Sequence, residues 1–305
     1  MNSIVTGVIA AKLSEHARKP VFANVDAPYG FGGALTYSKG RPVDGGWQLE
    51  GDWRFMTSSA DARWCTIYTL GVLRSDRPEL LAMVLPMDEL EVSDSWLDAS
   101  SMRGSGSNAV RTPGSPGLFV PAERVVAQAQ PPLVDRPLYR VDPLVVLWLP
   151  CAALVIGALR DAIDGMFELA GPKLGSVPGR PRHADSWRVQ QAACDATAAA
   201  DCLSAGLAAV VAELWSHAEA ATKPPPQLRA RWWSLLFHTL DDARRHVSDL
   251  FALSTSAVYA TGNRVERCFR DIHAVATTFE QPHVQAYRRA SGLVLLGHEP
   301  DNPAF

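Results

Sequence analysis

The sequence predicts an α+β protein in which short strands come first and long helices follow. The first half is rich in glycine, proline and short apolar runs, whereas the chain from Val145 onward is rich in alanine and leucine with helical periodicity. A proline-rich stretch, residues 127–143, separates the halves and has the composition of a linker. With 305 residues, 47% hydrophobic and 20% charged, the chain is long enough for a sizeable core, and its length favours two domains.

The candidate strands of the first half are short and are bounded by turn signals. Residues 47–49 and 53–55 alternate in polarity around Gly51 and Asp52, which predicts two paired strands. Such strands with frequent turns are typical of a small barrel or sandwich. Further apolar or β-branched runs lie at residues 63–73, 80–85 and 118–120.

The second half contains four or five helical segments joined by short connections. The first, residues 145–170, carries its polar residues Arg160, Asp161, Asp164 and Glu168 on one face. Long helices with short connections predict an antiparallel bundle. The other helices are expected at about residues 185–221, 227–260, 263–281 and 282–296.

Charge and cysteine usage argue against several classes of protein. A net charge of -3 gives no electrostatic reason to expect nucleic acid or an anionic membrane as partner. The five cysteines form no C-x-x-C motif, which argues against a disulfide framework or zinc site and fits a reducing cytoplasm. No signal peptide is expected. The most apolar stretch, residues 144–159, contains Pro150 and is shorter than the ~20 residues of a spanning helix, which favours a buried core helix.

Seven short segments follow one another in a recognisable order. They are Pro42 to Trp47, Leu49 to Gly51, Trp53-x-Phe55, Gly104 to Asn108, Phe119 to Arg124, Arg267 to Ala274 and Gly297 to Pro303. Together they resemble the acyl-CoA dehydrogenase-like flavoproteins, and most of all the two-component flavin-dependent monooxygenases of that fold. The resemblance covers roughly Gly32 to the C-terminus, and it is stronger evidence for the family than for the reaction.

The resemblance implies a small antiparallel β-barrel that binds flavin, residues 32–130, followed by an antiparallel four-helix bundle, residues 131–305. Residues 1–31, with a short helix from Ile4 to about Ala17, would be a remnant of an N-terminal helical domain. In the family that domain walls part of the flavin and substrate pocket. The chain is therefore expected to be a fragment, to have a mis-assigned start, or to be a reduced member that works with another protein.

The resemblance also implies the residues of a flavin site. Thr57 falls where the monooxygenases often carry Ser or Thr near flavin N5, so its hydroxyl is expected to hydrogen-bond the ring or its oxygen adduct. The alternative is a strand threonine bonded only to the backbone. The other residues implied at the cofactor are Phe55 and Met56 on the same strand, Gly33, Ala34, Leu35 and Thr36 in a small-residue turn, and Lys173, Ser256, Ala257 and Arg270.

His273 is the candidate acid or base of the helical half, because it lies one helical turn from Arg270 on the same face. The alternative is a buried histidine bonded within the bundle. Family monooxygenases commonly carry a second histidine five residues further on, where Thr278 stands here. This difference weakens the hydroxylase interpretation.

Two other chemistries fit less well. Many acyl-CoA dehydrogenases carry their catalytic glutamate directly after a tyrosine, but Ala260 follows Tyr259 and supplies no carboxylate base. His238, Asp242 and His246 share one helical face, yet the two histidines are ~12 Å apart along the axis, too far for one ion. No metal is therefore expected.

The sequence thus predicts a flavin-dependent monooxygenase component that uses reduced FMN or FAD and oxygen on a small organic substrate. A flavin reductase would be its partner, and it would act in the cytoplasm as a homodimer or homotetramer. The alternatives are an acyl-CoA dehydrogenase-like enzyme and a non-catalytic subunit that assembles with a complete paralogue.

Overall fold

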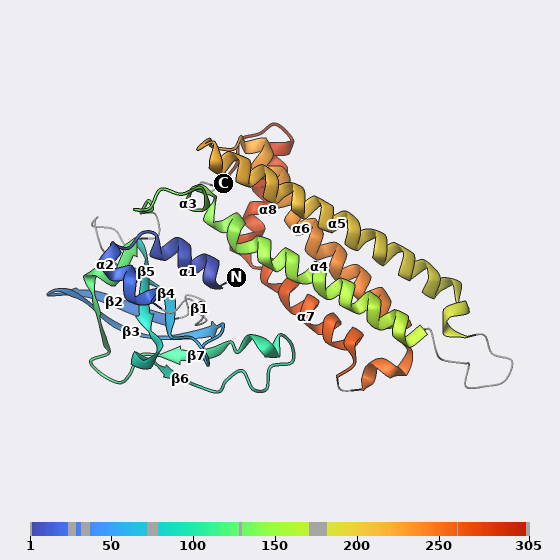
Figure 1. The fold of residues 1–305 in the computed structure, drawn as a ribbon, viewed down its shortest axis with the longest axis horizontal. Coiled ribbons are helices and arrows are strands. Elements are labelled where there is room, and N and C mark those ends of the chain that lie inside the picture. Colours follow the sequence, from blue (N-terminus) through green and yellow to red (C-terminus); the bar gives the residue numbers. More distant parts are fainter. Residues whose placement is uncertain are drawn as a thin grey trace. The chain divides into compact units, whose positions relative to one another are not determined.

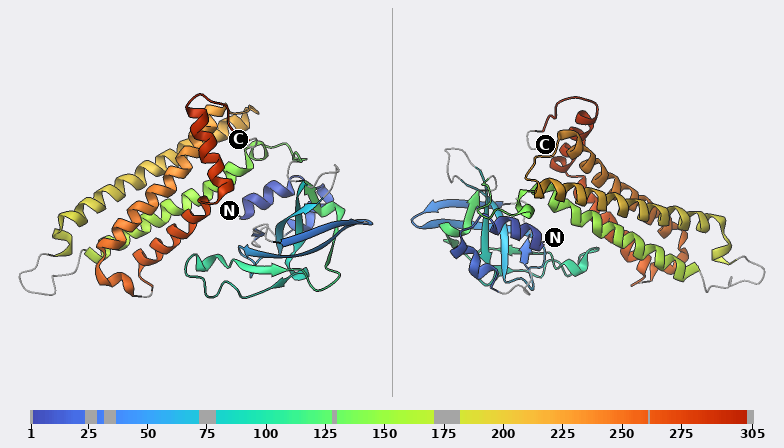
Figure 2. Two further views of the ribbon diagram at one scale, coloured as in Figure 1. Left: turned by 180° about the vertical axis from the view of Figure 1, so that it is seen from behind. Right: turned by 45° about the horizontal axis from the view of Figure 1, so that its top comes forward.

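The computed structural model describes residues 2–23, 29–31, 37–71, 79–127, 130–170, 182–260 and 262–302. The chain forms two compact units, Met1–Val146 and Leu147–Phe305. The first unit contains the strands and the second contains the long helices (Figures 1 and 2).

Two sheets make up most of the first unit. One sheet has the order β1-β4-β5-β9, and the other has the order β2-β3-β7-β6, with β8 pairing with β3 as well. The β1–β4 pair is parallel, while the other described pairs are antiparallel. The strands are β1 (Tyr29–Phe31), β2 (Tyr37–Val43), β3 (Gly46–Met56), β4 (Trp64–Gly71), β5 (Glu79–Pro86), β6 (Glu91–Val92), β7 (Asn108–Arg111), β8 (Leu118–Pro121) and β9 (Val125–Ala127).

The predicted turn at Gly51 and Asp52 is wrong, because β3 runs through both residues. The hairpin turn lies earlier, at Asp44 and Gly45, where Gly45 has φ 74° and β3 folds back on β2. Gly51 serves packing instead: a Cβ there would lie 2.6 Å from the ring of Trp53. The Trp53 indole therefore occupies space that a side chain at position 51 would fill.

The strand β5 separates two apolar clusters of the first unit. Its residues Leu81 and Met83 face the cluster built around Trp47 and Trp53 between the sheets. Its Ala82 and Val84 face the opposite side, as the period of two requires.

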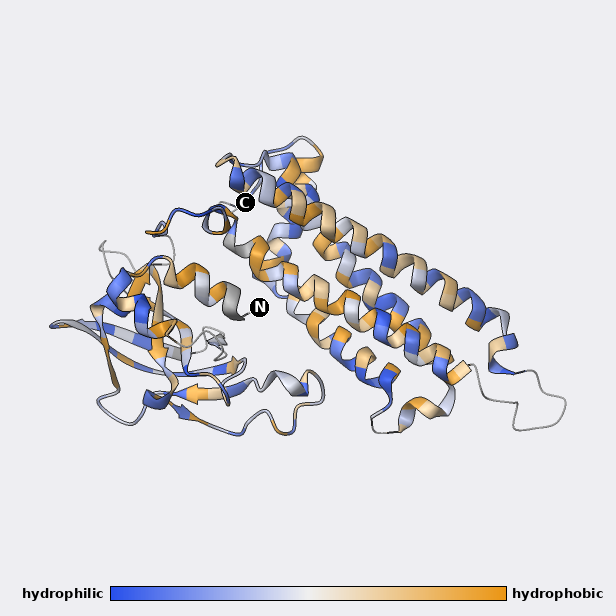
Figure 3. Cartoon of the chain, viewed as in Figure 1, coloured by the Kyte–Doolittle hydropathy of each residue, from blue (hydrophilic) through white to orange (hydrophobic). Residues whose placement is uncertain are grey.

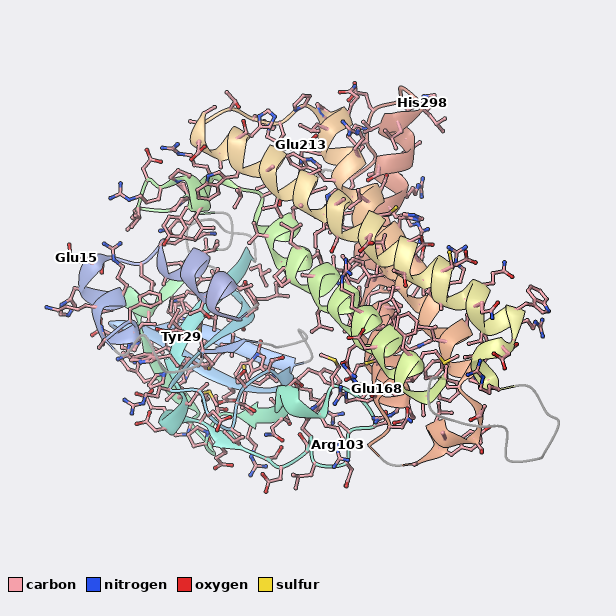
Figure 4. All side chains as sticks on the ribbon, turned by 45° about the vertical axis from the view of Figure 1, so that its right-hand side comes forward. Glu15, Tyr29, Arg103, Glu168, Glu213 and His298 are labelled. Atoms are coloured by element: carbon pink, nitrogen blue, oxygen red, sulfur yellow. The ribbon has the colours of Figure 1, made fainter. Side chains whose placement is uncertain are left out.

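Two short helices, α1 (Asn2–Ala10) and α2 (Glu15–Val21), pack on that opposite side through Ile9 and Ala17, together with Leu13 of the turn between them. The predicted single helix from Ile4 to Ala17 is therefore divided. Ser14 begins the second helix, because its side chain accepts a hydrogen bond from the Ala17 amide at 3.2 Å. Tyr29, labelled in Figure 4, donates its hydroxyl proton to the Val21 carbonyl at 3.1 Å and so fastens the end of α2 to β1.

The second unit consists of long helices close to their predicted positions. They are α4 (Pro143–Ala170), which begins in the first unit, α5 (Trp187–Glu219), α6 (Pro226–Leu253), α7 (Arg264–Phe279) and α8 (Pro282–Leu295). The predicted helix 227–260 ends early, because Thr255 has φ 63° and the chain continues as the 3-10 turn η5 (Thr255–Tyr259). The shorter helical segments are α3 (Pro137–Arg140), within the predicted linker, and the 3-10 turns η1 (Met87–Glu89), η2 (Arg103–Ser105), η3 (Ala122–Arg124) and η4 (His183–Asp185).

Helix α6 lies against α5, α7 and α8. Aromatic rings bridge them: Trp233 stacks on Tyr287 at 4.5 Å, Phe237 meets Phe279 at 5.7 Å, and Phe279 meets Trp148 of α4 at 4.5 Å. Trp233 and its neighbour Trp232 are both buried within the unit. They therefore supply no exposed surface for an oligomer.

By length and hydropathy alone, residues 145–170 and 187–219 pass the test for a membrane-crossing helix. Core helices of soluble proteins pass the same test. In Figure 3 hydrophilic residues recur along α5, and α4 carries charged residues from Arg160 onward; Arg160 pairs with Asp201 of α5 at 2.8 Å. These features fit helices that pack against one another within a folded unit.

Candidate functional site

The end of β3 and the segment after it have a strained backbone. Phe55 and Ser58 have φ of 62° and 64°, in the left-handed region that residues with a Cβ seldom adopt, and they flank Thr57. Met102 and Gly106, on the segment that faces them, have φ of 51° and 52°. Among the described residues, three of the five non-glycine positions with positive φ are thus found here. Such strain gathers at functional sites because the surrounding structure must hold it.

A bulge accounts for the turn of β3 at Phe55. Between the paired residues Trp53–Val110 and Met56–Asn108, β3 has one more residue than β7. The extra residue changes the direction of the strand. Met56 remains fully buried, whereas the ring of Phe55 is turned outward and is 56% exposed.

Backbone hydrogen bonds join the residues after β3 to the Gly-Ser-rich segment before β7. The Ser58 amide donates to the Ser105 carbonyl at 2.8 Å, and the Ser59 amide and hydroxyl donate to the Gly106 carbonyl at 3.3 and 3.0 Å. Arg103 of this segment is labelled in Figure 4. The two segments therefore hold each other in place.

Three hydroxyls form a continuous row across this junction. Ser107 Oγ lies 3.1 Å from Thr57 Oγ1 and 2.7 Å from Ser105 Oγ. The middle residue, Ser107, is buried, while Thr57 and Ser105 are half-buried. We refer to Thr57, Ser107 and Ser105 as the hydroxyl row.

Trp96 organises the loop beside the hydroxyl row. Its backbone amide donates to Asn108 Oδ1 at 3.0 Å, and its indole Nε1 donates to the Met102 carbonyl at 3.1 Å. Its ring meets the ring of Phe55 edge to face, with 6.1 Å between the centroids. The exposed Phe55 ring is thus supported from one side and open on the other.

The residues predicted for the helical half are held by their own helices. Arg270 forms a two-point ion pair with Glu266, one turn earlier on α7, and its Nη2 lies 3.0 Å from Glu266 Oε2. The pairing raises the pKa of Arg270 further. Ser256 and Ala257 lie in η5, and the Asn263 side-chain amide donates to the Ala257 carbonyl at 3.2 Å.

His273 is half-buried and bonded within the helices. Its Nδ1 lies 2.8 Å from the Phe269 carbonyl, so this nitrogen carries a proton. Its Nε2 lies 3.4 Å from Ser248 Oγ of α6, and its ring packs on Phe269 at 4.2 Å. These contacts agree with the structural alternative that the sequence left open.

The structure brings together Phe55, Met56 and Thr57 in the first unit, and Arg270 and His273 on α7 of the second. Met56 has its side chain in the apolar core, so it holds the strand and offers no surface for a ligand. Gly33, Ala34, Leu35, Thr36 and Lys173 lie outside the described residues.

Sequence reasoning did not assign roles to Trp96, Ser105 and Ser107. The segment Gly104 to Asn108 contributed to the family resemblance, but nothing in its pattern indicated that Ser107 meets Thr57. The two residues are 50 positions apart in the chain, and the β3–β7 pairing together with the hydrogen bonds of Ser58 and Ser59 brings them together.

Among the described residues, no group of three acidic, histidine or cysteine side chains is arranged to hold a metal ion. His238 Nε2 lies 3.2 Å from Asp242 Oδ2, but His246 Nε2 lies 3.4 Å from the guanidinium of Arg245. A cation beside His246 opposes the binding of a second cation there.

The chain is similar to a known family and to several known proteins. Residues 149–280 match the family "acyl-CoA dehydrogenase, C-terminal domain". The chain is 25% identical over 276 residues to a pigment production hydroxylase of Rhodococcus sp., covering 86% of this chain and 68% of that protein. It is 24% identical over 280 residues to the flavin-dependent monooxygenase oxygenase subunit HsaA of Rhodococcus jostii, covering 87% and 70%.

The solved structure of XiaF from Streptomyces sp. in complex with FADH2 and glycerol superimposes with a TM-score of 0.84 at 21% identity, covering 99% of this chain and 77% of that one. This likeness shows the fold. Residues 149–280 therefore match the acyl-CoA dehydrogenase C-terminal family, the chain has the acyl-CoA dehydrogenase-like fold, and the two relatives that it matches along most of its length are a hydroxylase and a flavin-dependent monooxygenase subunit.

Proposed function

We propose that this protein is the oxygenase component of a two-component flavin-dependent monooxygenase. It would take reduced FMN or FAD from a separate flavin reductase and use oxygen to hydroxylate a small organic substrate. The observation that carries the proposal is the strained end of β3, which turns the exposed ring of Phe55 outward beside the Thr57 hydroxyl.

The residues at this place fit an isoalloxazine ring. Such a ring has apolar faces and a polar edge, so its site needs an apolar wall beside a hydrogen-bonding group. Phe55 offers the wall, supported by Trp96. Thr57, held by Ser107, offers the hydroxyl. When bound, the reduced flavin would be the group that reacts with oxygen.

His273 is proposed as the residue that holds or moves a proton in the helical half. Its Nδ1 is committed to the Phe269 carbonyl at 2.8 Å. Among the described residues, the contact recorded for its Nε2 is a long one, 3.4 Å, to Ser248 Oγ. Proton exchange would therefore occur at Nε2.

The finer description of the fold follows from the same proposal. The two sheets within residues 32–130 would be the flavin-binding barrel, and α4 to α7 within residues 131–305 would be the four-helix bundle. We further infer a homodimer or homotetramer in the cytoplasm. Ser256, Ala257 and Arg270 would contact the cofactor.

No observation favours the dehydrogenase alternative. Tyr259 is 80% exposed, and Ala260 after it has no carboxylate for abstracting a proton.

The test is to mix the purified chain anaerobically with reduced FMN or FAD, add oxygen, and follow the absorption spectrum in time. The proposal expects saturable binding of reduced flavin and a reaction with oxygen that differs from that of free flavin. Spectra identical to those of free flavin would contradict the proposal and favour a non-catalytic subunit.

A further inference from the structure

The turn between α1 and α2 is buried, with Ala11, Lys12 and Leu13 only 3%, 6% and 1% exposed. The end of a helix leaves backbone carbonyls without partners inside the helix, and at a buried end water cannot supply the missing donors. The carbonyls of this turn therefore need donors from another part of the chain.

The linker between β9 and α4 supplies these donors. The Leu133 amide donates to the Ala11 carbonyl at 2.8 Å, and the Gln130 side-chain amide donates to the Lys12 carbonyl at 3.2 Å. Gln130 is also held to the end of β9, because its backbone amide donates to the Ala127 carbonyl at 3.0 Å. The linker is thus bonded to helices that lie far earlier in the chain, since Lys12 and Gln130 are 118 positions apart.

The contact of α1 with the sheet is weaker than its burial suggests, because it contains two unpartnered hydroxyls. Thr6 of α1 and Thr66 of β4 are fully buried, and within the described part of the chain neither side-chain oxygen has a hydrogen-bond partner. Cys65 and Ile67 face the core between the sheets, so by the period of two Thr66 faces the side on which α1 packs. A buried hydroxyl without a partner costs free energy, which the packing of α1 has to offset.

We propose that α1, α2 and the turn between them form a clamp that holds the linker and opens reversibly. The bonds to Ala11 and Lys12 close the clamp, whereas the unpartnered hydroxyls of Thr6 and Thr66 lower the free energy needed to open it. The closed clamp fixes residues 130–133 and shortens the free connection between β9 and α4. The open clamp releases that stretch. This inference concerns the first unit alone and does not depend on the proposed function.

Hydrogen exchange of the full chain tests the clamp, and the Leu133 amide is its direct reporter, because that amide exchanges only when its bond to Ala11 is broken. Gln130→Ala removes the second bond of the clamp and is expected to speed the exchange of Leu133 about fivefold, the equivalent of one hydrogen bond. Gln48→Ala is the matched control, since its side-chain amide also donates to a backbone carbonyl, that of Pro116 at 2.8 Å, but away from the linker. It should leave the exchange of Leu133 unchanged.

Thr6→Val and Thr66→Val test the clamp in the opposite direction. Each removes an unpartnered hydroxyl and keeps the shape of the side chain, so each should stabilise the closed clamp and slow the exchange of Leu133 about fivefold. Thr69→Val is the control, because Thr69 is equally buried on the same strand but accepts a hydrogen bond from Ser38 Oγ at 2.8 Å. It should not slow the exchange. The two threonine variants lie on different elements, which keeps the test informative if one of them folds poorly.

Exchange of Leu133 in the wild type at the rate of an unstructured amide, or an unchanged rate in Gln130→Ala, would show that the N-terminal helices do not hold the linker. Unchanged or faster exchange in both Thr6→Val and Thr66→Val would overturn the part of the proposal in which the hydroxyls favour opening. The measurements need no flavin, so their outcome is independent of the proposed function.

Discussion

At the scale of single residues, Thr57 is the residue of the first unit whose hydroxyl is proposed to contact the flavin. Its hydroxyl lies 3.1 Å from Ser107 Oγ, on a segment whose neighbours Phe55 and Ser58 are strained. Valine has nearly the same shape but no hydroxyl. Thr57→Val therefore separates the effect of the hydroxyl from the effect of packing.

We expect Thr57→Val to lower the free energy of unfolding by about 1.5 kcal/mol, because the hydrogen bond between this half-buried hydroxyl and Ser107 is lost. Binding of reduced flavin should weaken by about fivefold or more, the equivalent of one hydrogen bond to the ring. Thermal melts and anaerobic titrations measure the two effects.

The control is Thr112→Val, since Thr112 is also half-buried and its hydroxyl bonds the backbone of Gly51, away from the hydroxyl row. Equal flavin affinities for wild type and both variants would remove Thr57 from the site.

In the second unit, the Asp161 carboxylate of α4 accepts hydrogen bonds from three residues of α7. Its carboxylate accepts from Arg264 Nε at 2.8 Å, Arg267 Nη2 at 2.6 Å and Cys268 Sγ at 3.2 Å. Partial burial acts to raise its pKa, but the hydrogen bonds from Cys268, Arg264 and Arg267 outweigh it and the pKa is lowered. Burial, together with the bond to Asp161, raises the pKa of Cys268 to about 12, so this thiol remains a protonated donor at neutral pH.

Because its pKa is lowered on folding, Asp161 stabilises the protein at pH values above the unfolded carboxyl pKa of about 3.9. That stabilisation is lost as the pH falls through the lower folded pKa. We therefore expect Asp161→Asn to be less stable than wild type by ~1–2 kcal/mol at neutral pH, as for removal of charge-assisted hydrogen bonds on a partly exposed group.

Chemical denaturation at several pH values measures this difference, which should stay constant down to about pH 4 and shrink below it. Asp164→Asn is the control, because Asp164 is more exposed and lies 3.6 Å from Arg264; its effect should be small throughout. A difference for Asp161→Asn that persists at pH 2 would contradict the assignment.

At the scale of elements, the close approach of α4 and α7 depends on one glycine. A Cβ at Gly165 would lie 3.0 Å from Arg264 Cβ and 3.2 Å from Val265 Cγ2. The contact is tightened by the ion pair of Arg264 with Asp161, which joins the two helices. Glu168, labelled in Figure 4, lies two turns further along α4 and also pairs with Arg264.

Gly165→Ala is therefore expected to destabilise the protein, although alanine is intrinsically the better helix former by ~1 kcal/mol. Gly157→Ala in the same helix has nothing within 4 Å of the new Cβ and should stabilise by ~0.5–1 kcal/mol. Thermal melts followed by circular dichroism at 222 nm measure the stability of both variants. Equal stabilisation by both substitutions would show that α4 and α7 are not closely packed at Gly165.

At the scale of the whole molecule, the outward face of α5 is the feature that bears on assembly. Val211 and Trp215, one turn apart, are 48% and 43% exposed, and Ala208 and Ala212 beside them are exposed as well. An exposed apolar strip of this kind on a long helix is typical of a surface that a second subunit covers.

We therefore expect the wild-type protein to be a dimer or tetramer by light scattering at micromolar concentration. The double substitution Val211→Glu with Trp215→Glu should reduce the measured mass toward that of one chain, since it places charges on the strip. Ala209→Glu, an exposed position on another side of α5, is the control and should leave the mass unchanged. A monomeric wild type would contradict the prediction.

The order of strands before helices, the positions of α4 to α8 and the family resemblance were all determined by the sequence alone. Helices of this length carry their periodicity within themselves, so local pattern suffices to place them. The same local reasoning was wrong where the role of a residue depends on a side chain or strand that local pattern does not reveal. Gly51 has the composition of a turn but makes room for Trp53, and the short strands β1, β2, β6, β7 and β9 exist only through the strands that they pair with.

In the candidate site, too, some residues were named from the sequence, whereas their contacts came only from the tertiary structure. The roles of Phe55 and Thr57 at the cofactor are implied by the family resemblance and stay predictions. Tertiary structure alone decided that Ser107 meets Thr57 and that Met56 points into the core. It also decided that His273 is bonded to Phe269 and faces Ser248. The physical reason is that a hydrogen bond depends on the distance between two atoms, and for residues 50 positions apart that distance is set by strand pairing, bulge and turn together.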